Sequence, residues 1–288
     1  MKYVTQIDSF ELKDIFECGQ CFRWNKEADE SYTGVFDNCV INVKKFSDKI
    51  IFEGKCAENI DQKQFESKIN KYFDLERDYA RIKNILSKVD ENLKISIKYG
   101  EGIRILSQDL WETIISFIIS ANNNIPRIKG IIERISEKYG NKIEWQGKNY
   151  YTFPTPNQLS QASVQNLREL GLGFRDVRVY ETTNKINTNK FNLKELYNKT
   201  TEEARNELLT LDGIGPKVAD CILLFSDLKR FNVFPIDVWV RRVMNELYIH
   251  NEVEEKVNKK EIQKLADEKF GDLQGIAQQY LFYWKREA

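Results

Sequence analysis

Residues 211–220, LDGIGPKVAD, constrain the fold more than any other part of the chain. Gly213 and Gly215 permit positive φ and a close approach of two backbones. Pro216 suits the first turn of a helix, where it removes no hydrogen bond. Leucines at 208, 209 and 211 precede the glycines, and an apolar stripe at helical spacing follows them: Val218, Cys221, Ile222 and Phe225. The segment therefore predicts two helices joined by a glycine hairpin, the second over residues 217–225.

This hairpin also predicts chemistry. Its free N–H groups and the helix N-terminus that follows suit an anion such as a DNA phosphate. Lys217 lies in the first helical turn, where the positive end of the dipole is expected to make the amine easier to deprotonate. Asp237, in the segment PIDV, places a carboxylate at another predicted helix start. An amine nucleophile and a carboxylate that stabilises positive charge are the two groups that a base-excising lyase needs.

Both residues have simpler interpretations. A lysine on a helix is usually a solvated surface residue, and only the preceding hairpin and the later PIDV segment favour a catalytic Lys217. Asp237 is a good residue to cap a helix, and we expect it to have that role as well.

Five segments in chain order carry a resemblance to a known family. LDGIGPKVADCILLFS with the later PIDV resembles the helix-hairpin-helix, Gly/Pro-Asp superfamily of DNA glycosylases, and Lys217 is similar to its lyase-competent branch. Four further segments resemble the 8-oxoguanine DNA glycosylases: CGQCFRW (18–24), SANNNIPRI (120–128), LGLGFR (170–175) and GIAQQYLFYW (275–284). The resemblance implies a bifunctional glycosylase and lyase that removes 8-oxoguanine, preferably opposite cytosine, from duplex DNA in base excision repair.

The resemblance also implies how the reaction proceeds. Asp237 stabilises the oxocarbenium-like charge as the base departs. Lys217 attacks C1′ and forms a Schiff base, and β-elimination then cuts the strand 3′ to the lesion. Backbone carbonyls near the hairpin hold a structural monovalent cation, and no other cofactor is required; the carbonyls are those of Leu209, Leu211 and Ile214.

For the damaged base, the resemblance implies a pocket formed by four residues. The carbonyl of Gly19 accepts the N7–H that 8-oxoguanine has and guanine lacks, Gln278 bonds the Watson–Crick edge, and Phe282 stacks on the extruded base. Cys221 lies against the base, and a thiolate paired with the Lys217 ammonium is one form that it can take. The simpler alternatives are a small buried cysteine and a core phenylalanine.

On the other strand, the resemblance assigns Asn122, Arg127 and Arg175 to the cytosine left unpaired, and Phe174 to the vacated gap. Relatives commonly carry tyrosine at the position of Phe174. Relatives also often carry a phosphate-binding histidine at the position of Trp239, where an indole has only one donor. The alternative for residues 122–124 is an ordinary turn that caps the helix over residues 125–139.

The periodicity predicts an α+β fold class with two domains. Residues 1–100 are expected to form antiparallel strands, with turns at 37–38 and 48–49, followed by helices from Asp61 onward. Residues 101–288 are expected to form an all-α domain, in which 140–141 and 153–156 are surface loops, and the resemblance identifies it as a helix-hairpin-helix glycosylase domain. Its expected helices are 111–120, 125–139, 164–170, 176–186, 201–210, 217–225, 260–270 and 273–285.

The cysteines argue against a metal cluster. Cys18 and Cys21 form the only CxxC pair, and the single histidine, His250, is distant in sequence, so zinc and redox roles are the weaker alternatives. Because Cys221 is the only cysteine after Cys56, an iron–sulfur cluster is not expected. An odd number of cysteines and a start unlike a signal peptide favour a reducing compartment, cytoplasmic and nucleoid-associated in a prokaryote or nuclear otherwise.

The net charge and the pI do not by themselves identify the binding partner. The net charge is zero and the pI is about 6.7, which is not typical of a protein that coats DNA non-specifically. No apolar run approaches a membrane span, and a monomer acting on 8-oxoguanine-containing duplex DNA is expected. Two rival functions are a non-catalytic helix-hairpin-helix DNA-binding module and a glycosylase for another damaged base. The first would need neither Lys217 nor Asp237, and the second would not need Gly19 and Gln278.

Overall fold

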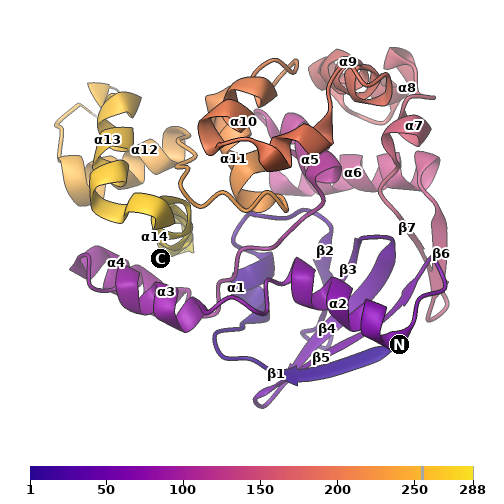
Figure 1. The fold of residues 1–288 in the computed structure, drawn as a ribbon, viewed down its shortest axis with the longest axis horizontal. Coiled ribbons are helices and arrows are strands. Elements are labelled where there is room, and N and C mark those ends of the chain that lie inside the picture. Colours follow the sequence, from indigo (N-terminus) through magenta and orange to yellow (C-terminus); the bar gives the residue numbers. More distant parts are fainter. Residues whose placement is uncertain (254–255, 288) are drawn as a thin grey trace.

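A computed structural model describes residues 1–253 and 256–287 of the chain. The N-terminal part forms an antiparallel sheet with helices beside it, and the rest of the chain is mostly helical (Figure 1). The predicted α+β class is therefore confirmed. Within those two ranges, no helix combines the length and the apolarity that crossing a membrane requires.

Five antiparallel strands form the main sheet, in the order β1-β5-β4-β3-β2. They are β1 (Lys2–Gln6), β2 (Trp24–Lys26), β3 (Tyr32–Phe36), β4 (Cys39–Phe46) and β5 (Lys49–Cys56). The predicted hairpin is present, and Asp37 and Asn38 have the positive φ, 45° and 60°, that two-residue hairpin turns favour. The turn between β4 and β5 lies at residues 47–48, one residue earlier than predicted, with Ser47 at a φ of 55°.

An aromatic cluster fills the space between the sheet, α1 (Leu12–Phe16) and α2 (Gln62–Tyr72). Phe36 stacks on Tyr72 with ring centroids 3.8 Å apart, and Trp24 Nε1 donates a hydrogen bond to the Tyr72 hydroxyl at 2.9 Å. Gly34 makes room for the indole, because a Cβ atom there would lie 2.4 Å from Trp24 Cδ2. This core fixes the segment that leads from α1 into β2.

The second core joins helices from both predicted domains. α3 (Tyr79–Leu86) and α4 (Glu91–Tyr99) contribute Ile82, Leu86 and Leu93 to the same apolar cluster as the C-terminal helices, and α4 packs against α14 (Gln274–Glu287). Figure 1 shows α3 and α4 beneath the C-terminal helix. The domain boundary at residue 100 stays a prediction, and the two helices before it pack with the second core.

Most of the remaining helices match the predicted ranges closely, but the helix over Pro156–Leu159 was not predicted, and only the start of the helix over Val238–Met244 was. The α-helices are α5 (Leu110–Ser120), α6 (Ile125–Tyr139), α7 (Pro156–Leu159), α8 (Val164–Glu169), α9 (Asp176–Asn187), α10 (Thr201–Leu208), α11 (Pro216–Phe225), α12 (Val238–Met244) and α13 (Lys259–Phe270). Short 3₁₀ helices are η1 (Gly173–Arg175), η2 (Leu193–Asn198) and η5 (Gly271–Leu273), and η3 (Asn245–Ile249) is a π-helical turn after α12. The long helices had amphipathic patterns that predicted them, whereas the short elements had none.

The prediction of helices alone over residues 101–288 is wrong at one place. β6 (Lys142–Trp145) and β7 (Lys148–Tyr151) form a two-stranded hairpin, with Gln146 and Gly147 at positive φ in the turn. Ile143 is buried against Val35 and Val40 of the main sheet, so this hairpin extends the contact between the two halves of the chain. Strands of four residues with one fully buried side chain carry too little alternation to be recognised in the sequence.

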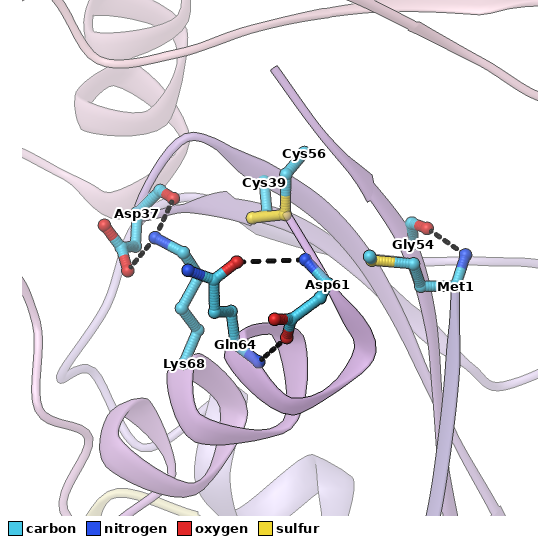
Figure 2. The surroundings of a disulfide bond; sticks show 8 residues. All are labelled: Met1, Asp37, Cys39, Gly54, Cys56, Asp61, Gln64 and Lys68. Atoms are coloured by element: carbon cyan, nitrogen blue, oxygen red, sulfur yellow. Dashed lines mark hydrogen bonds and ion pairs between the residues drawn. A yellow bond between two sulfur atoms is a disulfide. The ribbon is translucent and has the colours of Figure 1, made fainter. Parts of the chain in front are cut away.

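The cysteine count did not predict the disulfide bond between Cys39 and Cys56, which are register partners on β4 and β5. Figure 2 shows the bond beside the start of α2, where Asp61 and Gln64 form a reciprocal helix cap. The three other cysteines are free and buried. An odd number of cysteines therefore does not exclude one disulfide bond within the chain.

Candidate active site

The predicted glycine hairpin is present between α10 and α11. Gly213 has a φ of +87°, and a Cβ atom there would lie 2.6 Å from Cδ of Arg178. Gly215 occupies the N-cap of α11 without a side-chain cap, which leaves the first N–H groups of that helix available to an anion. The hairpin can therefore present backbone donors to a phosphate.

Lys217 lies in the first turn of α11, half-buried beside Cys221, Asp237 and an aromatic ring. Its Nζ is 5.7 Å from the ring centroid of Phe117. The interaction with Cys221, then the charge of Asp237, raises the pKa of Lys217 against the lowering effect of burial. The expectation of a more easily deprotonated amine is therefore wrong, because neighbouring groups outweigh the helix dipole. In the DNA-free protein Lys217 is an ammonium.

Cys221 lies one helical turn after Lys217 and is fully buried in the core. Burial is the largest cause of its pKa shift and raises the pKa of the thiol, which Lys217 lowers by a smaller amount. At neutral pH Cys221 is therefore a thiol, and the alternative of a thiolate paired with the Lys217 ammonium is not supported. A neutral sulfur suits contact with the face of a base.

Asp237 is the N-cap of α12, as predicted. Its Oδ1 accepts a hydrogen bond from the N–H of Val240 at 2.8 Å. This bond fixes the carboxylate near the Lys217 ammonium, whose pKa it raises. Trp239 is 38% exposed on the same helix, so its indole is accessible.

The predicted base pocket lies where the loop after α1 meets α14. Gly19 has a φ of +86°, and a Cβ atom there would lie 3.8 Å from Cε1 of Phe282. The Gln279 side chain of α14 donates a 2.6 Å hydrogen bond to the carbonyl of Cys18, which ties the loop to the helix. The Gly19 backbone and the Phe282 ring are thus held side by side.

Two side chains connect this pocket to the hairpin. Phe22, shortly after Gly19, packs edge-on against Phe117 with ring centroids 5.6 Å apart, and Phe117 also lies beneath Lys217. Helix α12, which begins after Asp237, packs against α14. These contacts join the Gly19 loop and α14 to the elements that carry the amine and the carboxylate predicted to act on the sugar.

Gln278 shows the clearest sign of a missing ligand. Its side chain is 6% exposed, and its Oε1 is a buried oxygen without a hydrogen-bond partner among the described residues. Buried polar atoms are nearly always hydrogen-bonded, and leaving one unpaired costs about 1–3 kcal/mol. A partner that donates a hydrogen bond to Gln278 would remove this cost.

The residues assigned to the opposite strand lie in two adjoining loops. Arg175 is buried, and its Nε and both terminal nitrogens donate hydrogen bonds to the carbonyls of Ala121, Asn122 and Leu172. These four bonds occupy four of the five guanidinium donors. The side chain braces the two loops and keeps at most one N–H for the contact with cytosine, which stays a prediction.

The other members of this group remain accessible. Arg127 is exposed and donates one bond, from Nη2 to the carbonyl of Gly171 at 3.3 Å. Phe174 is 55% exposed, and the guanidinium of Arg178 lies 5.3 Å from its ring centroid. Asn122 is exposed, whereas Asn124 caps α6 by accepting a bond from the Arg127 N–H. The simple capping alternative is thus correct for Asn124.

Two residues of this region have no role predicted from the sequence. Gln20 anchors the Gly19 loop through bonds to the carbonyls of Ile15 and Arg104 and from the N–H of Leu106. Arg286 lies beside Gly19 from the last turn of α14. Gln20 stands within the CGQC segment and Arg286 two residues beyond the last matched segment. Neither residue type alone indicated these contacts.

Cys18 and Cys21 lie in this loop as separate buried thiols. Burial raises the pKa of Cys18 to about 11 and that of Cys21 further. Both are therefore protonated at neutral pH, and neither fits a reactive redox pair. Within residues 1–253 and 256–287, no group of three His, Cys, Asp or Glu side chains is placed to hold a metal ion.

A glycine hairpin, an amine beside a carboxylate and a buried glutamine oxygen without a partner beside an aromatic ring are the features expected of a DNA glycosylase. The model of the 8-oxoguanine DNA glycosylase N-terminal domain matches residues 2–114, and that of the HhH-GPD superfamily base excision DNA repair proteins matches residues 115–269. The chain belongs to the HhH-GPD superfamily, as an 8-oxoguanine DNA glycosylase.

Individual relatives agree with this assignment. A probable N-glycosylase/DNA lyase of Methanothermobacter thermautotrophicus is 31% identical over 80% of this chain and 78% of its own. The structure of MBOgg1 with a low-affinity DNA ligand has 47% identity and a TM-score of 0.92, covering 99% of this chain and 96% of that chain. Another similar structure is that of the 8-oxoguanine glycosylase/lyase of Clostridium acetobutylicum in complex with double-stranded DNA containing cytosine opposite 8-oxoguanine. It has 43% identity and a TM-score of 0.90, covering 100% of this chain and 98% of that chain.

Proposed function

We propose that this protein extrudes 8-oxoguanine from duplex DNA, excises it in preference when cytosine is opposite, and cuts the strand at the resulting site. The observation that carries the proposal is the unpartnered Oε1 of Gln278 beside Phe282, on the helix that borders Gly19. The Watson–Crick edge of an 8-oxoguanine presents N–H groups, from which this oxygen can accept a hydrogen bond. A base inside the duplex cannot reach these residues, so it must leave the stack.

In the proposed reaction, Asp237 and Lys217 act in sequence at the sugar. The carboxylate of Asp237, held by its bond to Val240, stabilises the positive charge that develops as the glycosidic bond breaks. The base leaves with the electron pair of the glycosidic bond and takes a proton from the Lys217 ammonium. The freed amine nitrogen bonds to C1′, and loss of the bond between C1′ and the ring oxygen, which takes up a proton from the nitrogen, gives a Schiff base. β-Elimination then breaks the bond to the 3′ phosphate.

The hairpin carbonyls of Leu209, Leu211 and Ile214 suit a monovalent cation that bridges to a DNA phosphate. The Leu211 carbonyl accepts one bond, from the N–H of Ile214 at 3.2 Å, and a carbonyl oxygen has a second lone pair. The cation would screen phosphate charge at the hairpin, and the chemistry at C1′ uses only side chains of the chain.

We further propose that the protein acts as a monomer on duplex DNA, in the cytoplasm of a prokaryote or in the nucleus otherwise. The zero net charge does not oppose this, because several cationic side chains lie at the two loops of the site. These are Arg127, Arg134, Arg175 and Arg178. A local basic face is sufficient for contacts with a few phosphates.

Replacing Gly19 or Gln278 tests the choice of base. A methyl group at Gly19 would strain its backbone and lie 3.1 Å from Arg286 Nη1, and Gln278→Ala would remove the group that bonds the base edge. We expect each variant to excise 8-oxoguanine about 10- to 100-fold more slowly in single turnover, equivalent to the usual ~1–3 kcal/mol for an unpaired contact. Gln165→Ala, which changes an exposed glutamine on α8, is the control.

If both variants cut 8-oxoguanine at the parental rate, the lesion assignment fails while the superfamily assignment stands. Retained cutting of a duplex with an alkylated base, together with poor cutting of 8-oxoguanine by the parent, would favour the rival function, a glycosylase for another damaged base.

Replacing Arg127 tests the preference for cytosine. Its exposed guanidinium can donate two parallel bonds to O2 and N3 of cytosine, whereas adenine turns an amino group toward those donors. In single-turnover excision from duplexes with C, A, G or T opposite the lesion, Arg127→Ala should lose rate by about 10-fold or more mainly opposite cytosine. The matched control is Arg134→Ala, because Arg134 also donates to this loop, at the Leu170 carbonyl. An equal loss for all four partners would assign Arg127 to a phosphate instead.

A further inference from the structure

Arg286 continues a line of base-pocket residues along α14. Gln278, Phe282 and Arg286 follow one another at intervals of four residues, so they share one face of the helix. In the proposed function Gln278 bonds the Watson–Crick edge of the extruded base and Phe282 stacks on its face. The next position along this line therefore lies toward the opposite edge of the purine, which carries N7 and C8.

The surroundings of Gly19 place Arg286 at that edge independently. A Cβ atom at Gly19 would lie 3.1 Å from Nη1 of Arg286 and 3.8 Å from Cε1 of Phe282. The guanidinium carbon lies 5.4 Å from the ring centroid of Phe282. The guanidinium thus borders both the glycine proposed to accept N7–H and the ring proposed to stack on the base.

The side chain is anchored and keeps one donor group available. Its Nη2 donates to the carbonyl of Glu17, and its Nε forms an ion pair with Glu287 at 3.0 Å. Among the residues that the structure describes, Nη1 has no hydrogen-bond partner, and it is the nitrogen beside Gly19. Two of the three nitrogens therefore orient the third.

We propose that Arg286 is a specificity-determining residue whose Nη1 donates a hydrogen bond to O8 of the extruded 8-oxoguanine. O8 is adjacent to N7–H, so a donor next to the Gly19 carbonyl meets an acceptor there. Guanine has a C8–H at this position, which offers the guanidinium no acceptor. Gly19 and Arg286 together would read the two features by which the lesion differs from guanine, a gained N–H and a gained carbonyl oxygen. The inference rests on the proposed function, because it requires 8-oxoguanine in this pocket.

Equilibrium binding separates this role from a structural one. The duplexes carry 2′-fluoro-8-oxoguanine, 2′-fluoroguanine or a tetrahydrofuran abasic analogue opposite cytosine, none of which is excised. The parent should prefer the 8-oxoguanine duplex to the guanine duplex, and Arg286→Ala should reduce this ratio about 10-fold, as expected for loss of one charge-assisted hydrogen bond. Binding of the abasic analogue, which has no base to read, should stay unchanged. Lys285→Ala is the matched control, because the neighbouring Lys285 instead pairs with Glu246.

An equal loss of affinity for both bases would overturn the inference, because O6, which both bases share, would then be the partner. A matching loss on the abasic analogue would also overturn it, since Arg286 would then support only the fold or general DNA binding. An unchanged preference of Arg286→Ala for the 8-oxoguanine duplex over the guanine duplex would overturn the inference as well. If the parent itself shows no preference for 8-oxoguanine, the proposed function fails, and this outcome is visible before any variant is measured.

Discussion

Lys217→Gln is expected to abolish covalent trapping of the protein on DNA. Borohydride reduces a Schiff base, so the parent should form a stable adduct with a duplex containing 8-oxoguanine, and a glutamine amide cannot form one. Gln retains much of the length of the side chain above Phe117, and the hairpin donors are backbone groups. Binding of an abasic-analogue duplex should therefore be largely retained, and the loss should be in chemistry. Denaturing gel electrophoresis after borohydride treatment measures the adduct.

Lys185→Gln is the matched control for this prediction. Lys185 is also beside the hairpin, where it donates to the carbonyl of Thr210 and pairs with Asp212, each at 3.2 Å. The Lys185→Gln variant should form the borohydride-trapped adduct at the parental yield. An adduct of undiminished yield with Lys217→Gln would place the nucleophile on another residue.

Asp237→Asn should reduce excision by about 100-fold or more, the size of effect expected when a group that stabilises transition-state charge is lost. Asparagine keeps the shape and an oxygen that can accept the bond from the Val240 N–H, so the helix cap should survive. The variant should therefore unfold at nearly the parental temperature while its single-turnover excision of 8-oxoguanine falls.

Asp212→Asn, which neutralises a half-exposed carboxylate at the hairpin, is the comparison. It should leave excision nearly unchanged. If folded Asp237→Asn excises at close to the parental rate, Asp237 is only the cap of α12.

Elements with long apolar patterns could be predicted from the sequence, and isolated short ones could not. The hairpin glycines and the stripe that follows them specified α11, and Asp61 and Asp237 marked the starts of α2 and α12. The β6 and β7 hairpin had no comparable pattern, because its one fully buried residue, Ile143, packs on a sheet distant in sequence. Local patterns thus predict the long helices, whereas a short hairpin such as β6 and β7 is stabilised by contacts with distant segments, which a local pattern does not show.

The site shows the same limit at the level of single groups. The sequence predicted that Lys217 and Asp237 act together, but the direction of the Lys217 pKa depends on how closely Cys221 and Asp237 approach it. The four bonds of Arg175 and the approach of Arg286 to Gly19 join segments far apart in the chain. Such distances are set by the packing of the helices and have no local signature.

Incubation of the protein with a set of duplexes that each carry one defined lesion tests the central claim most directly. The duplexes differ only at one position, which holds 8-oxoguanine, an alkylated purine or undamaged guanine opposite cytosine. We expect that only the 8-oxoguanine strand is cut, 3′ to the lesion and without added metal or cofactor. Cutting confined to the alkylated duplex, or binding to all three without cutting, would contradict it.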